Sequence, residues 1–144
     1  MDHLMQMVLL MLEGTEVTLE IFVVTFILVL PLGLFAALGR LSSLRLLNRA
    51  LELYIWIMRG TPLMLQLLFV YFALPMVGIK LSDIAAALLA FTLNYTAYFA
   101  EIFRAGIQAV PKGQYEAAHM LGLSKVQTMW RVVIPQMIRN VLPP

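Results

Sequence analysis

The sequence predicts an all-α fold, a polytopic transmembrane helix bundle. Of the 144 residues, 62% are apolar and only 12% are charged, whereas soluble domains carry about 25% charged residues. The mean hydropathy is +0.89, and three long stretches of the chain contain no charged residue. So little polar surface cannot cover a small soluble body. We therefore expect an integral membrane protein that lies in a lipid bilayer.

The composition also excludes several classes of site. The chain has no cysteine, which excludes disulfides, thiolate metal sites and a cysteine nucleophile. Its two histidines, His3 and His119, are far apart and fit no metal-ligand pattern. The net charge of +2 is small and the basic residues are dispersed, so no nucleic-acid partner is expected. The chain has no phosphate-binding loop and no catalytic constellation, so we expect neither a cofactor nor enzymatic activity.

The first expected element is a short N-terminal segment, residues 1–15, on the extracytoplasmic side or at the membrane interface. Its apolar stretch, residues 4–12, is only nine residues long, too short to span a bilayer. A cleaved signal peptide would need a basic leader. Because Asp2 is the only charged residue there, that interpretation is rejected.

Three charge-free windows are expected to span the membrane. They cover residues 21–39, 60–79 and 84–100, and a spanning helix needs about 20 apolar residues. The first window contains Pro31 and Gly33, which transmembrane helices tolerate.

The placement of lysine and arginine predicts the orientation of these spans. Only acidic residues precede the first span, whereas basic residues follow the first and third spans. These basic residues are Arg40, Arg45, Arg49, Arg104, Lys112, Lys125, Arg131 and Arg139. Loops rich in lysine and arginine face the cytoplasm. The N-terminus is therefore expected to be extracytoplasmic.

The sequence after the third span contains the start and stop signals of two consecutive helices. A helix is expected over residues 112–121, and Gly122 is a natural C-terminal stop. Ser124 with Gln127 three residues later matches a capping box. The second helix is expected to end at Pro135.

One motif in this segment is specific. Glu116, Ala117 and Ala118 are followed after three residues by Gly122, and after nine more by Val-Val-Ile-Pro ending at Pro135. This pattern resembles the EAA loop of ABC importer permeases, with conservative changes at two apolar positions.

Other segments resemble the same family. They are Arg-Gly-Thr-Pro-Leu at 59–63, residues 98–107 before the loop, and residues 14–19 at the entry to the first span. Together they are similar to the histidine/glutamine-type permeases for polar amino acids. The resemblance implies a type I ABC importer fold with three spans and the cytoplasmic EAA helices. It also implies that residues 16–144 form a partial transmembrane domain lacking the last spans.

The resemblance implies a function and its partners. The EAA segment would dock on a cytoplasmic ATP-binding-cassette ATPase subunit, which hydrolyses ATP. The permease would pair with an identical or related permease and receive polar amino acids from an extracytoplasmic binding protein. The expected location is the cytoplasmic membrane. The alternative is a truncated or split permease fragment that acts as a non-transporting membrane subunit.

Charged residues near the end of the third span suggest an ion pair. Glu101 and Arg104 lie one helical turn apart, so they can pair. Ionisable groups within spans are functional candidates, but a structural ion pair is favoured at this position. Arg59 is a possible second partner of Glu101.

Uncharged polar residues in the spans have two interpretations. They can line a translocation path or hydrogen-bond to neighbouring helices. Helix contact is favoured for Gln66 and Thr96. Asn94 and Tyr98 lie four residues apart on one helix face and are expected to line the path.

Overall fold

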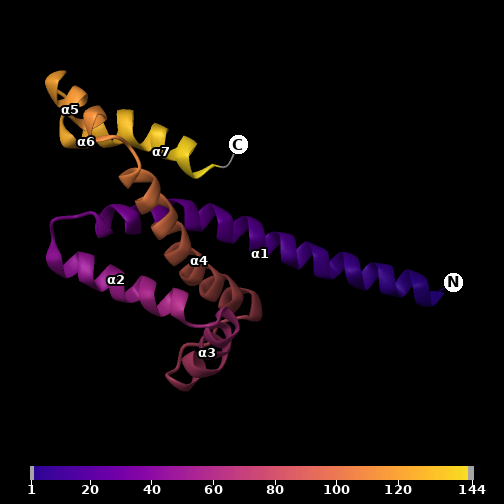
Figure 1. The fold of residues 1–144 in the computed structure, drawn as a ribbon. Coiled ribbons are helices and arrows are strands. Elements are labelled where there is room, and N and C mark those ends of the chain that lie inside the picture. The colour runs from indigo at the N-terminus through magenta and orange to yellow at the C-terminus, as the bar shows by residue number, and fades with distance from the viewer. Residues whose placement is uncertain (1, 143–144) are drawn as a thin grey trace.

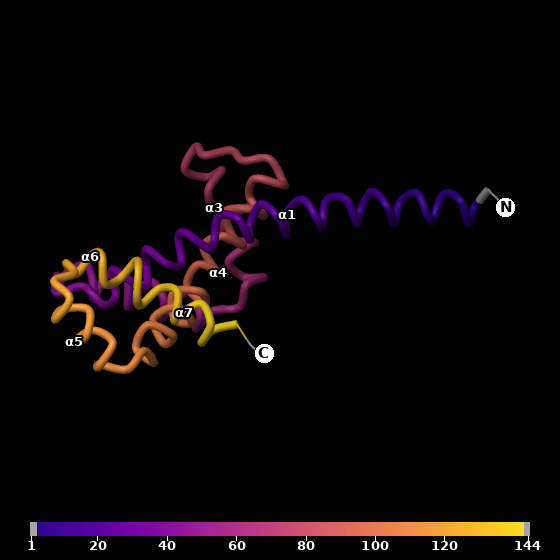
Figure 2. Tube along the Cα trace, turned by 90° about the horizontal axis from the view of Figure 1, so that it is seen from above, coloured from indigo at the N-terminus to yellow at the C-terminus, as the bar shows by residue number. Residues whose placement is uncertain are grey.

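The computed structural model describes residues 2–142, and over that range the regular structure is entirely helical (Figures 1 and 2). The elements are α1 (Asp2–Arg40), α2 (Arg45–Gly60), α3 (Leu63–Met76), α4 (Asp83–Gln108), α5 (Lys112–Met120), α6 (Lys125–Thr128), the π-helix η1 (Met129–Val133) and α7 (Ile134–Val141). The predicted all-α fold is confirmed. Residue 1 of the expected N-terminal segment and residues 143–144 of the expected transmembrane domain lie outside the described residues.

Helix α1 is a single helix of 39 residues, which at 1.5 Å per residue is about 58 Å long. The hydrocarbon core of a bilayer is only about 30 Å thick. The N-terminal half of α1 extends away from the remaining helices (Figure 2). The expected N-terminal segment, residues 1–15, is not a separate element of structure, because α1 runs without a break through residue 15; its extracytoplasmic or interfacial location stays a prediction. This stretch is rich in the strong helix formers Leu, Met and Glu.

Helices α1 and α4 form the centre of the molecule and run in the same direction (Figure 1). The rings of Phe26 and Phe99 meet edge to face, with their centroids 6.4 Å apart. Nearer the C-terminal ends of the two helices, Ala37 packs in one cluster with Phe103. A Cβ atom at Gly33 would lie 2.7 Å from the Cβ of Phe99, so this glycine lets the two helices approach closely.

The second expected span, residues 60–79, corresponds to α3, which forms a bent pair with the preceding helix α2. Helix α2 ends at Gly60 and α3 begins at Leu63, with a bend of 104° between them. The helical part of the charge-free window 60–79 is essentially α3, which at 14 residues is shorter than the roughly 20 residues that a span needs. Pro62 explains the break, because proline disfavours helical geometry in the residue before it. Within residues 2–142, two helices are long and apolar enough to cross a membrane, and a third crossing exists only if the bent pair counts as one span.

The C-terminal segment is the expected helix pair with one correction. Helix α5 covers the predicted residues, and the capping box of Ser124 with Gln127 is present. The expectation that the second helix ends at Pro135 is wrong. The chain continues through the π-helix η1 into α7, where Pro135 occupies the first turn. Proline has no amide hydrogen to donate within a helix. The wider turn of the π-helix before Pro135 accommodates the missing hydrogen bond.

Candidate functional site

The segment from α5 to α7 is anchored on α4 by an apolar core. Val133, Ile134 and Met137 are buried against Phe103 and Ile107 of α4. This seat is tight, because a Cβ atom at Gly106 of α4 would lie 2.9 Å from the Cγ of Met137. A displacement of α7 would therefore be transmitted directly to α4.

Helix α5 is held beside the end of α4 by a further contact. The hydroxyl of Tyr115 donates a hydrogen bond to the carbonyl of Ile107 over 3.4 Å. Partial burial raises the pKa of Tyr115 above its usual value, which further favours the protonated form that donates this bond.

The end of α5 has a defined backbone geometry. The Leu123 amide donates to the carbonyl of Ala118 over 3.0 Å, and the Gly122 amide donates to that of His119 over 2.9 Å. This pair of bonds is a Schellman motif, which needs a left-handed residue after the helix. Gly122 supplies it with a φ of +75°. The sharp turn between α5 and α6 therefore depends on Gly122.

The residues of the EAA pattern divide into two groups. Ala118 is buried and supports the local packing. Glu116, Ala117, Gly122 and Pro135 are exposed. The exposed group is the part of the pattern that can contact another molecule.

The tip of this segment also carries large exposed apolar side chains, of which Met120 and Leu121 were not predicted from the sequence. Met120 is 86% exposed and Leu121 is 81% exposed. Val126 and Trp130 are also exposed. Exposed apolar clusters mark interaction sites. The sequence did carry a signal for this exposure. Met120 and Leu121 are neighbours that directly precede the helix-ending Gly122, so both side chains cannot be buried against the same core.

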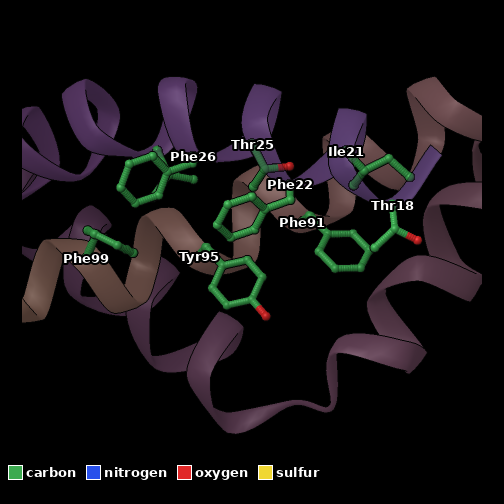
Figure 3. A pocket seen from close by; sticks show the side chains of 9 residues that line it. Thr18, Ile21, Phe22, Thr25, Phe26, Phe91, Tyr95 and Phe99 are labelled. Atoms are coloured by element: carbon green, nitrogen blue, oxygen red, sulfur yellow. The ribbon is translucent and has the colours of Figure 1, made fainter. Parts of the chain in front are cut away.

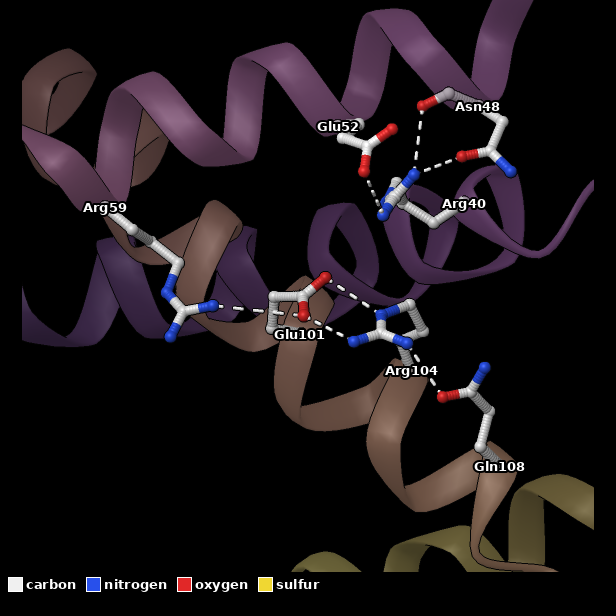
Figure 4. Close-up of polar contacts among 7 residues, drawn as sticks. All are labelled: Arg40, Asn48, Glu52, Arg59, Glu101, Arg104 and Gln108. Atoms are coloured by element: carbon white, nitrogen blue, oxygen red, sulfur yellow. Dashed lines mark hydrogen bonds and ion pairs between the residues drawn. The ribbon is translucent and has the colours of Figure 1, made fainter. Parts of the chain in front are cut away.

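A second group of polar contacts surrounds Glu101 of α4 (Figure 4). Arg104 donates to both carboxylate oxygens, from Nε to Oε1 over 2.9 Å and from Nη2 to Oε2 over 2.6 Å. Arg59 of α2 approaches from the other side, with Nη1 3.9 Å from Oε2. Arg104 also donates to Gln108 over 2.7 Å. The carboxylate thus lies between two guanidinium groups from two helices.

The structure adds a neighbouring polar group that sequence reasoning missed. Arg40 at the end of α1 donates to the side chain of Asn48, and its Nη2 lies 3.3 Å from Oε1 of Glu52 (Figure 4). Asn48 and Glu52 are four residues apart and therefore share a face of α2. That spacing was visible in the sequence, but it does not reveal that this face meets Arg40.

These two groups border one polar cavity of about 430 Å³. Its lining residues are Arg40, Glu52, Ile55, Trp56, Arg59, Gly60, Tyr98 and Glu101. The lining offers two guanidinium groups and two carboxylates, which can meet both charges of a zwitterion. The Arg59 guanidinium also lies over the Tyr98 ring, with Cζ 5.4 Å from the centroid, within the range of a cation–π contact.

The two residues expected to line a path are placed differently. Tyr98 borders the polar cavity, whereas Asn94 is not among its lining residues. Asn94 is only 4% exposed, and its amide hydrogen-bonds to the Met58 carbonyl and to Gln66. Gln66, for which helix contact was expected, bonds at the α2–α3 break. The hydroxyl of Thr96 is buried and has no hydrogen-bond partner among the described residues.

A second cavity, of about 510 Å³, lies between α1 and α4 (Figure 3). Its lining residues are Thr18, Ile21, Phe22, Thr25, Phe26, Val29, Phe91, Tyr95 and Phe99. The lining is dominated by aromatic rings and carries no charged group. Such a cavity suits an apolar side chain or hydrocarbon rather than a polar solute.

Comparison with known proteins places these features in context. Residues 29–144 match a family model described as binding-protein-dependent transport system inner membrane component. The chain is 47% identical over 132 residues to a probable amino-acid ABC transporter permease protein, YckA, of Bacillus subtilis (strain 168), covering 92% of this chain and 58% of that protein.

Two further relatives carry more specific names. A putative glutamine transport system permease protein, GlnP, of Rickettsia bellii (strain RML369-C) is 42% identical over 137 residues, which is 94% of this chain and 63% of that one. The arginine transport system permease protein ArtQ of Bacillus subtilis (strain 168) is 43% identical over 133 residues, or 92% and 61% of the two chains. The chain spans less than two thirds of each relative.

A solved structure has the same fold. It is a crystal structure of an amino acid ABC transporter with histidines, which matches with a TM-score of 0.78 and 39% sequence identity. The match covers 94% of this chain and 66% of the other.

Proposed function

The chain belongs to the family of binding-protein-dependent transport system inner membrane components, and from this premise we propose that it is a permease subunit of an ATP-binding-cassette importer for polar amino acids. The named substrates of two relatives, glutamine and arginine, support this substrate class. Similarity to permeases over more than nine tenths of the chain also supports a permease function.

The exposed tip of α5 is the observation that carries the proposal. Glu116 and Ala117 lie beside Met120 and Leu121, and all four are exposed. A carboxylate next to an apolar cluster suits a partner groove that has a basic rim and an apolar floor. We propose that a cytoplasmic ATPase subunit docks here and hydrolyses the ATP. The tight seat of α7 on α4 would carry its movement into the membrane.

The polar cavity supports a place for the solute near the cytoplasmic ends of the helices. Its two cations and two anions could transiently meet the carboxylate and the ammonium group of an amino acid. In this proposal Tyr98 contacts the path directly and Asn94 supports it from the same face of α4. The pairs of Glu101 with Arg104 and Arg59 would hold the shape of the cavity.

The remaining partners belong to the same proposal. A second permease, identical or related, would complete the path, and an extracytoplasmic binding protein would deliver the amino acid. The N-terminus would be extracytoplasmic and the basic loops cytoplasmic, as loops rich in lysine and arginine generally are.

Co-purification with the ATPase subunit tests the docking proposal. Leu121→Glu places a charge in the apolar tip, so we expect ATPase co-purification from membranes to be lost. Val77→Glu is the matched control, since Val77 is 73% exposed but follows α3. Stoichiometric ATPase in the Leu121→Glu sample, and also after deletion of residues 115–123, would contradict docking at this segment.

A further inference from the structure

The break between α2 and α3 leaves the last carbonyls of α2 without their usual helical partners, and Met58 carries one of them. In an α-helix the carbonyl of residue 58 would accept from the amide of residue 62. That residue is Pro62, which has no amide hydrogen. An unpaired carbonyl is costly in the low-dielectric environment of a membrane protein. The Met58 carbonyl therefore needs a donor from elsewhere.

Two side-chain amides provide that donor. Nε2 of Gln66 in α3 donates to the Met58 carbonyl over 2.9 Å, and Nδ2 of Asn94 in α4 donates to the same oxygen over 3.1 Å. Asn94 also donates to Oε1 of Gln66 over 2.9 Å. The three groups form a closed triangle that joins α2, α3 and α4.

Further bonds hold the residues of the break itself. Nε2 of Gln66 contacts Oγ1 of Thr61 at 2.6 Å and its carbonyl at 3.2 Å. The Thr61 hydroxyl is 2.8 Å from the Ile57 carbonyl, which it can donate to. Gln66, which lies in α3, thus bonds back across the break to the end of α2. Side chains therefore fix the bend, and it is not a flexible joint.

We infer that Gln66 and Asn94 form an amide clamp that sets the α2–α3 bend and thereby positions Arg59. Arg59 follows Met58 directly in the chain, so fixing the Met58 carbonyl also fixes the backbone from which the Arg59 side chain extends. From there it reaches the Tyr98 ring and the Glu101 carboxylate. Neither clamp residue lines the polar cavity, so both are positioning residues. The claim that this placement matters for transport rests on the proposed function. The existence of the clamp does not depend on that function.

A distance between two spin labels tests the clamp. The chain has no cysteine, so Leu53→Cys in α2 and Phe72→Cys in α3 provide the only labelling sites, and both positions are exposed. The full chain is measured in lipid nanodiscs by pulsed electron resonance. We expect one narrow distance in the parent chain. Gln66→Leu or Asn94→Leu should replace it with a broad distribution shifted to longer distances.

Thr96→Val is the matched control, because Thr96 is also buried in α4 but its hydroxyl has no partner to lose. It should keep the narrow distance. The double variant Gln66→Leu with Asn94→Leu should resemble the more severe single variant, because both amides serve one carbonyl. Helix content by circular dichroism verifies that each variant is folded. A narrow distance retained in both single leucine variants would overturn the clamp, as would equal broadening in Thr96→Val.

Amino-acid uptake in proteoliposomes separates this inference from the proposed function. The parent chain is reconstituted with the ATPase, the binding protein and the second permease that the proposed function requires. No uptake by the parent chain would count against the proposed function and leave the distance result standing. A broadened distance with unchanged uptake would show that the position of Arg59 does not matter for transport, which would overturn that part of the inference.

Discussion

Gly122 illustrates how a single backbone angle decides the shape of the docking segment. Its φ of +75° is needed for the Schellman bonds that end α5, and a side chain in this region costs about 1–2 kcal/mol. Space is not the constraint, because a Cβ atom there would meet nothing within 4 Å. The cost of substitution is therefore conformational, and it should act on the turn that presents Met120 and Leu121.

We predict that Gly122→Val destabilises this turn by about 1–2 kcal/mol and reduces ATPase co-purification, while membrane insertion is unchanged. Gly113→Ala is the comparison, since Gly113 lies within α5 in open space and at an ordinary φ. Alanine there should be neutral or stabilising by up to about 1 kcal/mol. Quantitative co-purification and membrane fractionation check both variants. Equal losses in the two would argue against a special role for the left-handed residue.

At the scale of residues, the sequence was enough to predict patterns formed by residues that are close together along the chain. The distances along the chain between Glu116, Gly122 and Pro135 carried the EAA pattern, and the Ser124 cap follows from neighbouring residues. The partners of Arg40 could not be found in the same way. Asn48 and Glu52 meet it only because α1 and α2 fold back on one another, and the packing of helices is not encoded in a local spacing.

At the scale of elements, the contact between α1 and α4 is the most sensitive to volume. Gly33 faces the Cβ of Phe99, and Ala36, Ala97 and Ala100 are buried nearby. Small residues let helices in membranes approach closely, and their packing stabilises the pair. A larger side chain at Gly33 cannot be accommodated without separating the two helices.

We predict that Gly33→Leu lowers the stability of the chain by about 1–3 kcal/mol, the usual cost of overpacking, and lowers its unfolding temperature in detergent. Gly14→Leu makes the same chemical change in the same helix, but at a site with nothing within 4 Å. It should leave the unfolding temperature nearly unchanged. If both variants melted alike, the close approach at Gly33 would not be the cause.

The elements themselves were predictable where one signal dominates. The charge-free window near residues 84–100 lies within α4, and glycine and serine mark the turn from α5 to α6. The window at residues 60–79 misled because hydropathy does not show that its helix, α3, has only 14 residues and is separated from α2 at Pro62 by a bend of 104°. The continuity of α1 was missed because length was judged from charge alone, and exposed glutamates do not end a helix.

At the scale of the whole molecule, the helices separate into three regions. The N-terminal half of α1 extends alone, the bent α2–α3 pair packs on the central α1–α4 pair, and the α5–α7 segment lies at the far end of α4 (Figure 1). The start of α1, which contains Leu4, and α5, which ends at Met120, lie at opposite ends of this arrangement (Figure 1), and both residues are exposed. The proposed orientation therefore places them on opposite sides of the membrane.

We predict that a membrane-impermeant maleimide labels Leu4→Cys in intact cells, but labels Met120→Cys only after the membrane is opened. The parent chain has no cysteine, so it provides the unlabelled control. The reason is the excess of lysine and arginine in the loops on the Met120 side. Labelling of Met120→Cys in intact cells, with Leu4→Cys protected, would reverse the orientation.

The parallel arrangement of α1 and α4 has a consequence for biosynthesis. The face of α1 that carries Gly33 and Ala37 is completed by α4, yet residues 41–82 are synthesised between the two helices. At about 5–20 residues per second, this interval lasts roughly 2–8 s. During that time the nascent α1 has no α4 to pack against. The insertion machinery or surrounding lipid must shield its small-residue face until the ribosome delivers the second half of the pair.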